Sequence, residues 1–148
     1  MKTSSIFPLF SAILLLFISG YSNVGIAQSS PDKQSYIEKV KAFPVTFVVS
    51  DSDSGAADVW GRAQSFVALY SAMQLHIITD YVIETDNPQK DDLSFAYLVV
   101  RTPLSNSFQI TIVCRTSGGL NSEADLNAHI LAYYMKTGEL PYPGLIRR

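Results

Sequence analysis

The stretch SFAYLVVRTPLSNSFQITIVCR, residues 94–115, decides the fold. In its second half apolar and polar side chains alternate, which is typical of a strand with one buried face. The apolar positions are Phe108, Ile110, Ile112 and Cys114. Between the two halves lies TPLSNS, where Pro103 and Asn106 suit a hairpin loop. The sequence therefore predicts two antiparallel strands, 94–101 and 108–115, joined by a short turn.

Two further strands are expected upstream of this pair. Residues 75–85 alternate between an apolar face (Leu75, Ile77, Tyr81, Ile83) and a polar face (His76, Asp80, Glu84). The turn DNPQKDD at 86–92 connects this strand to the next, so the three consecutive strands form a meander. VTFVVS at 45–50 is a β-branched run of the kind found in buried strands.

Two helices are predicted around the first strand by the spacing of apolar residues. A short helix over 34–43 precedes it and ends at Pro44. A longer amphipathic helix begins after the turn DSDSG at 51–55. Asp53 or Ser54 is expected to cap this helix by accepting its free backbone N–H groups.

A last helix completes the predicted order (α)βαβββα. It begins with Ser122 and Asp125 as a capping pair and ends at Gly138 in a left-handed conformation. The order predicts an α+β two-layer sandwich, an antiparallel sheet of about four strands with two helices on one face. Residues 45–148 form the single domain, and residues 28–44 form a linker and short helix.

The first 27 residues have the pattern of a secretory signal peptide. Lys2 supplies a positive charge, residues 6–18 form a mostly apolar core, and Gly25 and Ala27 are small residues before a cut at Gln28. A retained membrane anchor is the alternative, but the core is shorter than the ~20 residues of a span. We therefore expect an exported chain, periplasmic or extracellular, with no stable membrane span after cleavage.

Composition and charge exclude several classes of protein. The 148 residues are 47% apolar and 16% charged, as in one globular domain rather than a disordered chain. A pI near 5.6 argues against binding to nucleic-acid phosphates. The order αβββα also occurs in double-stranded-RNA-binding domains, which need basic residues where this chain has Glu123 and Asp125. No nucleic-acid partner is expected.

The single cysteine limits redox and metal chemistry. One cysteine cannot form an internal disulfide or a cysteine-based zinc cluster. Cys114 lies on the apolar face of its strand, so we expect a buried structural thiol and no nucleophile.

Asp51 and Asp53 are the clearest candidates for catalysis and for metal binding. They follow a buried strand, and two carboxylates at a strand tip can hold a hard cation. VVSDSDSG at 48–55 resembles the first motif of haloacid-dehalogenase-like phosphatases, which implies Asp51 as nucleophile, Asp53 as general acid and magnesium between them. The chain departs from that family, because Ser54 replaces its threonine and the predicted sheet is antiparallel. The alternative is a turn and helix cap with no metal.

His76 is a third catalytic candidate. It shares the polar face of its expected strand with Asp80, and a histidine–carboxylate pair can perform acid–base chemistry. No G-x-S-x-G nucleophile motif accompanies it, and the simpler interpretation is a surface histidine. His129 adjoins the apolar stripe of the last helix and is expected to pack there.

Phe95 and Tyr97 are the candidates for a binding surface. They share a strand face with Val99, and both faces of residues 95–100 are apolar. The pattern therefore leaves open which face the helices cover. If they cover the opposite face, Phe95 and Tyr97 form an exposed aromatic patch.

Three segments resemble small exported bacterial proteins of unknown function. They are VWGRAQSFVALY at 59–70, TDYVIETDNP at 79–88 and ADLNAHILAYYMKTGEL at 124–140. The resemblance spans about two thirds of the chain. It implies an exported location and a fold similar to the TATA-binding protein, and it brings no catalytic motif.

We expect a non-enzymatic binding module in the cell envelope, with no cofactor and with an envelope protein or glycan as partner. A small metal-assisted hydrolase or phosphatase that uses Asp51 and Asp53 is the alternative. A structural envelope component without a ligand is a third possibility.

Overall fold

A computed structural model describes residues 32–146 of the chain. The predicted signal peptide, residues 1–27, lies outside the described residues. The elements are α1 (Lys33–Lys41), β1 (Thr46–Ser50), α2 (Ala56–Tyr70), β2 (Leu75–Ile78), β3 (Val82–Thr85), β4 (Ala96–Pro103), β5 (Ser107–Arg115) and α3 (Ser122–Thr137). The predicted α+β class is confirmed, with five strands in place of four.

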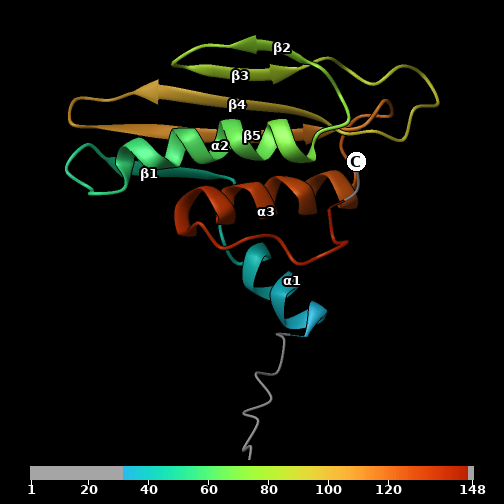
Figure 1. Cartoon of the computed structure of the whole chain (residues 1–148), viewed down its shortest axis with the longest axis horizontal. Coiled ribbons are helices and arrows are strands. Elements are labelled where there is room, and N and C mark those ends of the chain that lie inside the picture. Colours follow the sequence, from blue (N-terminus) through green and yellow to red (C-terminus); the bar gives the residue numbers. More distant parts are fainter. Residues whose placement is uncertain (1–31, 147–148) are drawn as a thin grey trace, which may run out of the picture.

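The five strands form one open antiparallel sheet in the order β1-β5-β4-β3-β2 (Figure 1). β4 and β5 form the predicted hairpin, and Val99 lies opposite Ile112 in its register. β1 pairs with the far side of β5, so the two edge strands of the sheet are β1 and β2.

The extra strand arises because residues 75–85 fold back on themselves. The prediction of one continuous strand is wrong, since β2 ends at Ile78 and β3 begins at Val82. The Thr79 hydroxyl accepts hydrogen bonds from the backbone N–H groups of Tyr81 (3.2 Å) and Val82 (2.9 Å). A local side-chain bond of this kind offers the backbone a turn in place of the ladder.

One face of the sheet is covered by α2 and α3, which lie side by side across it (Figure 1). Phe66 of α2 is fully buried between Tyr97 of β4 and Tyr134 of α3, with ring centroids 6.0 and 5.7 Å away. The alternating apolar residues of β5 point into the same core. Among residues 32–146 no helix lies on the opposite face of the sheet, so this part of the chain forms two layers.

The short helix α1 packs beside α3 through aromatic and charged contacts. The ring of Tyr36 meets that of Tyr133 edge to face at 6.3 Å. Glu139 accepts hydrogen bonds from the Lys39 ammonium and from the Tyr133 hydroxyl, both at 2.6 Å. The bond from Lys39, followed by that from Tyr133, holds the pKa of Glu139 below its usual range. Lys39 also lies over the Tyr133 ring at 4.9 Å, so one cluster joins α1, α3 and the C-terminal segment.

Of the predicted helix caps, the one at the C-terminus of α3 is confirmed, and those at the N-termini of α2 and α3 are wrong. Gly138 has φ +74° at the C-terminus of α3, as predicted. The N-cap is Asn121, whose side chain accepts from the N–H groups of residues 123 and 124, so the prediction of Ser122 is wrong by one residue. The N-cap of α2 is Gly55 and makes no side-chain cap bond, so capping by Asp53 or Ser54 is also wrong.

Arg62 of α2 caps the C-terminus of α3 from a neighbouring helix. Its guanidinium donates to the backbone carbonyl oxygens of Met135 (3.0 Å) and Lys136 (3.4 Å). These carbonyls are left without helical partners at the C-terminus of a helix, and a cation there is favourable. Arg62 therefore fixes α2 against α3.

Within residues 32–146, none of the helices has the length and apolar character needed to cross a membrane.

Candidate functional site

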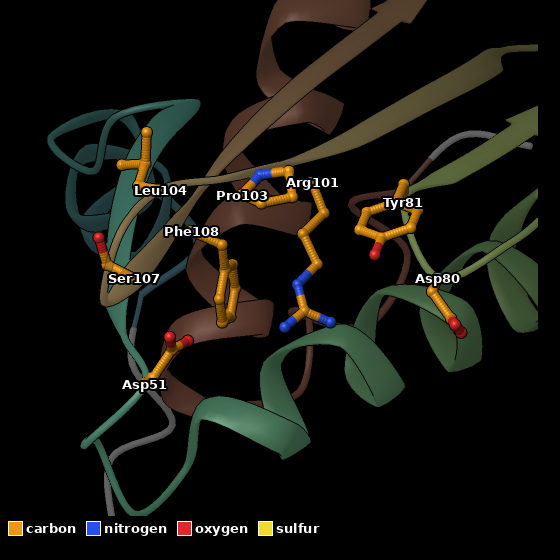
Figure 2. A pocket seen from close by; sticks show the side chains of 8 residues that line it. All are labelled: Asp51, Asp80, Tyr81, Arg101, Pro103, Leu104, Ser107 and Phe108. Carbon is orange, nitrogen blue, oxygen red and sulfur yellow. The ribbon is translucent and has the colours of Figure 1, made fainter.

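A pocket of about 240 Å³ lies on the helix-covered face, at the end of the sheet where the β4–β5 hairpin turns (Figure 2). Three connections meet there: the turn after β1, the β2–β3 turn and the β4–β5 loop. We call it the Arg101 pocket, and its lining is Asp51, Asp80, Tyr81, Arg101, Pro103, Leu104, Ser107 and Phe108.

Arg101 extends into the middle of this pocket (Figure 2). Its guanidinium carbon lies 4.1 Å from the centroid of the buried Phe108 ring. An aromatic ring stabilises a guanidinium above its face and leaves the N–H groups free to donate in the guanidinium plane. Among residues 32–146 the Arg101 guanidinium has no ion-pair or hydrogen-bond partner. It is therefore a partly buried cation whose donors are available to a ligand.

Backbone hydrogen bonds hold the walls of the pocket in place. The Arg101 N–H donates to the carbonyl of Tyr81 at 2.8 Å, which fixes the β2–β3 turn beside β4. The Asp51 N–H donates to the carbonyl of Asn106 at 3.1 Å, which fixes the turn after β1 beside the hairpin loop. The pocket is thus built by the ordered ends of strands.

The structure separates the two predicted carboxylates. Asp51 lines the Arg101 pocket, whereas Asp53 lines a different pocket of about 350 Å³ at the start of α2. There the Asp53 carboxylate lies 3.6 Å from the Lys136 ammonium. No three His, Cys, Asp or Glu side chains in the described part of the chain come together as a metal-ligand set. Asp51 and Asp53 therefore do not face a common reaction centre.

Neither histidine lines this pocket, and the two have different surroundings. His76 is exposed, and its Nδ1 is 3.3 Å from a carboxylate oxygen of Asp86. The prediction that His76 and Asp80 share one strand face is wrong, because β2 ends at Ile78 and the chain turns before Asp80. His129 packs as predicted, with Nδ1 2.6 Å from the carbonyl oxygen of Phe43.

The structure decides the question that the sequence left open, since Phe95 and Tyr97 are only 2% and 1% exposed and form no aromatic patch on the open face of the sheet. The helices cover the face on which Tyr97 and Val99 lie, because that face also carries the apolar side of β5. Phe95 lines a pocket of about 550 Å³ formed by the 92–95 and 116–123 segments.

Cys114 is buried, as the sequence predicts. Burial raises the pKa of its thiol to about 12. Burial likewise raises the pKa of the neighbouring Tyr97 hydroxyl. A thiol that stays protonated at neutral pH is a poor nucleophile, so Cys114 serves the core.

The open face of the sheet carries a mixture of apolar and polar side chains. By register, Leu98 lies opposite Val113 and Val100 lies opposite Thr111 on this face. The strand residues that point there include no aromatic side chain in the part of the chain that the structure describes. The Arg115 guanidinium on this face is paired with Glu84 at 3.3 Å and with Asn87 at 2.8 Å.

No family model matches the chain, and no curated protein matches it.

The sequence did not predict the central residues of the pocket, although one feature of the pattern indicates Arg101. Arg101 has the same parity as Tyr97 and Val99, which places a charged side chain on a buried strand face. A charge in that position is rare without a partner or a function. Asp51 was predicted as a nucleophile or metal ligand, not as part of this pocket. Asp80 and Tyr81 line the same pocket because the β2–β3 turn lies at this end of the sheet.

Proposed function

We propose that this chain is an exported, non-enzymatic binding module of the cell envelope that takes an acidic group of its partner in the Arg101 pocket. One observation carries the proposal: the Arg101 guanidinium is stacked on Phe108 and has no protein acceptor among the described residues. A planar guanidinium with free donors binds a carboxylate through two parallel hydrogen bonds.

The surroundings of Arg101 favour a singly charged acid as the bound group. Asp51 and Asp80 lie at the margins of the pocket, and their charges repel a doubly charged phosphate or a nucleic-acid backbone. The partner is accordingly an envelope protein or glycan that presents a carboxylate. The alternative of a metal-assisted hydrolase loses support, since Asp53 faces Lys136 in a separate pocket.

Export is part of the proposal, and the N-terminal sequence supports it. The apolar core over 6–18 and the small residues Gly25 and Ala27 are typical of a cleaved signal. Expression of the full chain with its own N-terminus, followed by fractionation and mass spectrometry, tests this directly. We expect an extracytoplasmic product that begins at Gln28, and an intact cytoplasmic chain would contradict export.

Binding at Arg101 can be tested by NMR with sodium butyrate as a simple carboxylate probe. The exported product is labelled with ¹⁵N, and the Nε–Hε signal of Arg101 is followed during titration. We expect saturable shifts at Arg101 and at the backbone of Tyr81, and no such shifts in Arg101→Gln.

Arg115→Gln is the matched control, because Arg115 is already paired with Glu84 on the opposite face of the sheet. It should bind butyrate like the wild-type protein. Equal shifts in wild type and Arg101→Gln, or no shifts in wild type, would refute the proposed site.

A further inference from the structure

We infer that the ligand of the Arg101 pocket is a zwitterion, a molecule or peptide end that carries one carboxylate and one ammonium group. This inference rests on the proposed function, since it assigns the carboxylate to Arg101. It adds a second contact, in which Asp51 and Asp80 receive the ammonium group.

The arrangement of charge in the pocket carries the inference. Figure 2 shows the Arg101 guanidinium between Asp51 on one side and Asp80 on the other. Neither carboxylate forms an ion pair with Arg101 or with any other described residue. A purely anionic ligand would be attracted by one charge and repelled by two. A ligand with both charges satisfies the guanidinium and at least one carboxylate.

The size and walls of the pocket limit the bound group further. A volume of about 240 Å³ lies below the range of about 300–1,000 Å³ that is usual for drug-sized ligands, and it equals the volume of about eight water molecules, so the pocket holds a ligand of that size. Pro103 and Leu104 supply an apolar wall, and Tyr81 and Ser107 supply hydroxyl groups. An amino acid, or the charged end of a peptide whose remainder projects into solvent, has the matching chemistry.

The neighbouring pocket at the start of α2 lacks these features, although it also contains cations. Arg62 there donates to the carbonyl of Met135, and Lys136 lies against Asp53. Its cations therefore already have protein partners, whereas Arg101 and its two flanking carboxylates have none among the described residues.

A series of ω-amino acids tests the inference and measures the spacing of the two charges. β-Alanine, γ-aminobutyrate and 6-aminohexanoate place the ammonium group progressively farther from the carboxylate. Butyrate and butylamine each carry one of the two charges and serve as controls. We expect one member of the series to bind about tenfold more tightly than butyrate, measured by NMR titration at low ionic strength.

The double variant Asp51→Asn/Asp80→Asn separates this inference from the proposed function. Both side chains are exposed, so the variant should keep the dispersed NMR spectrum of the folded chain. We expect it to retain butyrate binding and to lose the advantage of the zwitterion.

The other outcomes distinguish the two ideas. If wild type binds butyrate and every ω-amino acid equally, the zwitterion inference fails and the proposed function stands. If butyrate binds only the double variant, Asp51 and Asp80 neutralise Arg101 in the wild-type protein, and both fail. If no probe binds either protein, the proposed function fails and the inference fails with it.

Discussion

Replacing Phe66 should test how the helix layer is held to the sheet. Its side chain has no exposed surface and lies near three tyrosine rings, with centroid distances of 4.9 Å to Tyr70, 6.0 Å to Tyr97 and 5.7 Å to Tyr134. Phe66→Ala should lower the free energy of unfolding by about 4 kcal/mol, because a buried ring is lost and a cavity remains. Phe66→Leu keeps most of the volume but loses three ring pairs, so it should cost about 2 kcal/mol.

Urea unfolding followed by tryptophan fluorescence measures both values. Trp60 is the only tryptophan of the chain, and it is buried on the same helix as Phe66. Leu69→Ala is the control, because Leu69 is 61% exposed on that helix and should change stability by less than about 0.5 kcal/mol. A cost below about 1.5 kcal/mol for Phe66→Ala would refute the buried contact. Equal costs for Phe66→Ala and Phe66→Leu would refute the contribution of the ring pairs.

Three further predictions concern the ends of α3 and its contact with α1. Gly138→Ala should cost about 1–2 kcal/mol in urea unfolding, because φ is +74° and the new Cβ would lie 3.4 Å from Arg62; an unchanged midpoint would contradict this. Asn121→Ala should lower stability by about 1 kcal/mol and Asn121→Asp should not, since only alanine removes the acceptor for two N–H groups; equal thermal midpoints would argue against the cap. The pKa of Glu139 is lowered in the folded state, so its stabilisation is present above its unfolded pKa of about 4.3 and is lost as the pH falls through the lower folded value. The free energy of unfolding should therefore fall less between pH 5 and pH 2.5 in Glu139→Gln than in wild type. Identical pH profiles would show that the hydrogen bond between Lys39 and Glu139 does not stabilise the folded state.

The sequence predicted those parts of the fold that repeat along the chain. The alternation in residues 108–114 correctly placed β5 and its buried face, and Gly138 correctly marked the end of α3. The errors arose where one side chain decides the local path. Thr79 closes a turn inside an alternating stretch, and Asn121 takes the capping position beside the equally suitable Ser122.

The sequence indicated one residue of the candidate site, Asp51, but not the residues that lie around it. Asp51 was a candidate because two carboxylates follow a strand, yet in the structure it lines one pocket with Arg101 and Asp80, whereas Asp53 lies in another pocket beside Lys136. Asp51 lies in the turn after β1, Asp80 in the β2–β3 turn and Arg101 near the end of β4, three places that are far apart along the chain. Local patterns carry no information about which turns meet at one end of a sheet.

The sequence by itself determined the fold class, the buried face of β5 and the inert character of Cys114, because each depends on neighbours one to four residues away. Only the tertiary structure decided which face of β4 the helices cover, since both faces of residues 95–100 are apolar. It also decided that Arg101 stacks on Phe108, because the register of β4 against β5 brings together two residues that a hairpin loop separates. Periodicity follows from the backbone geometry of each element, whereas the pocket follows from how the elements pair and pack.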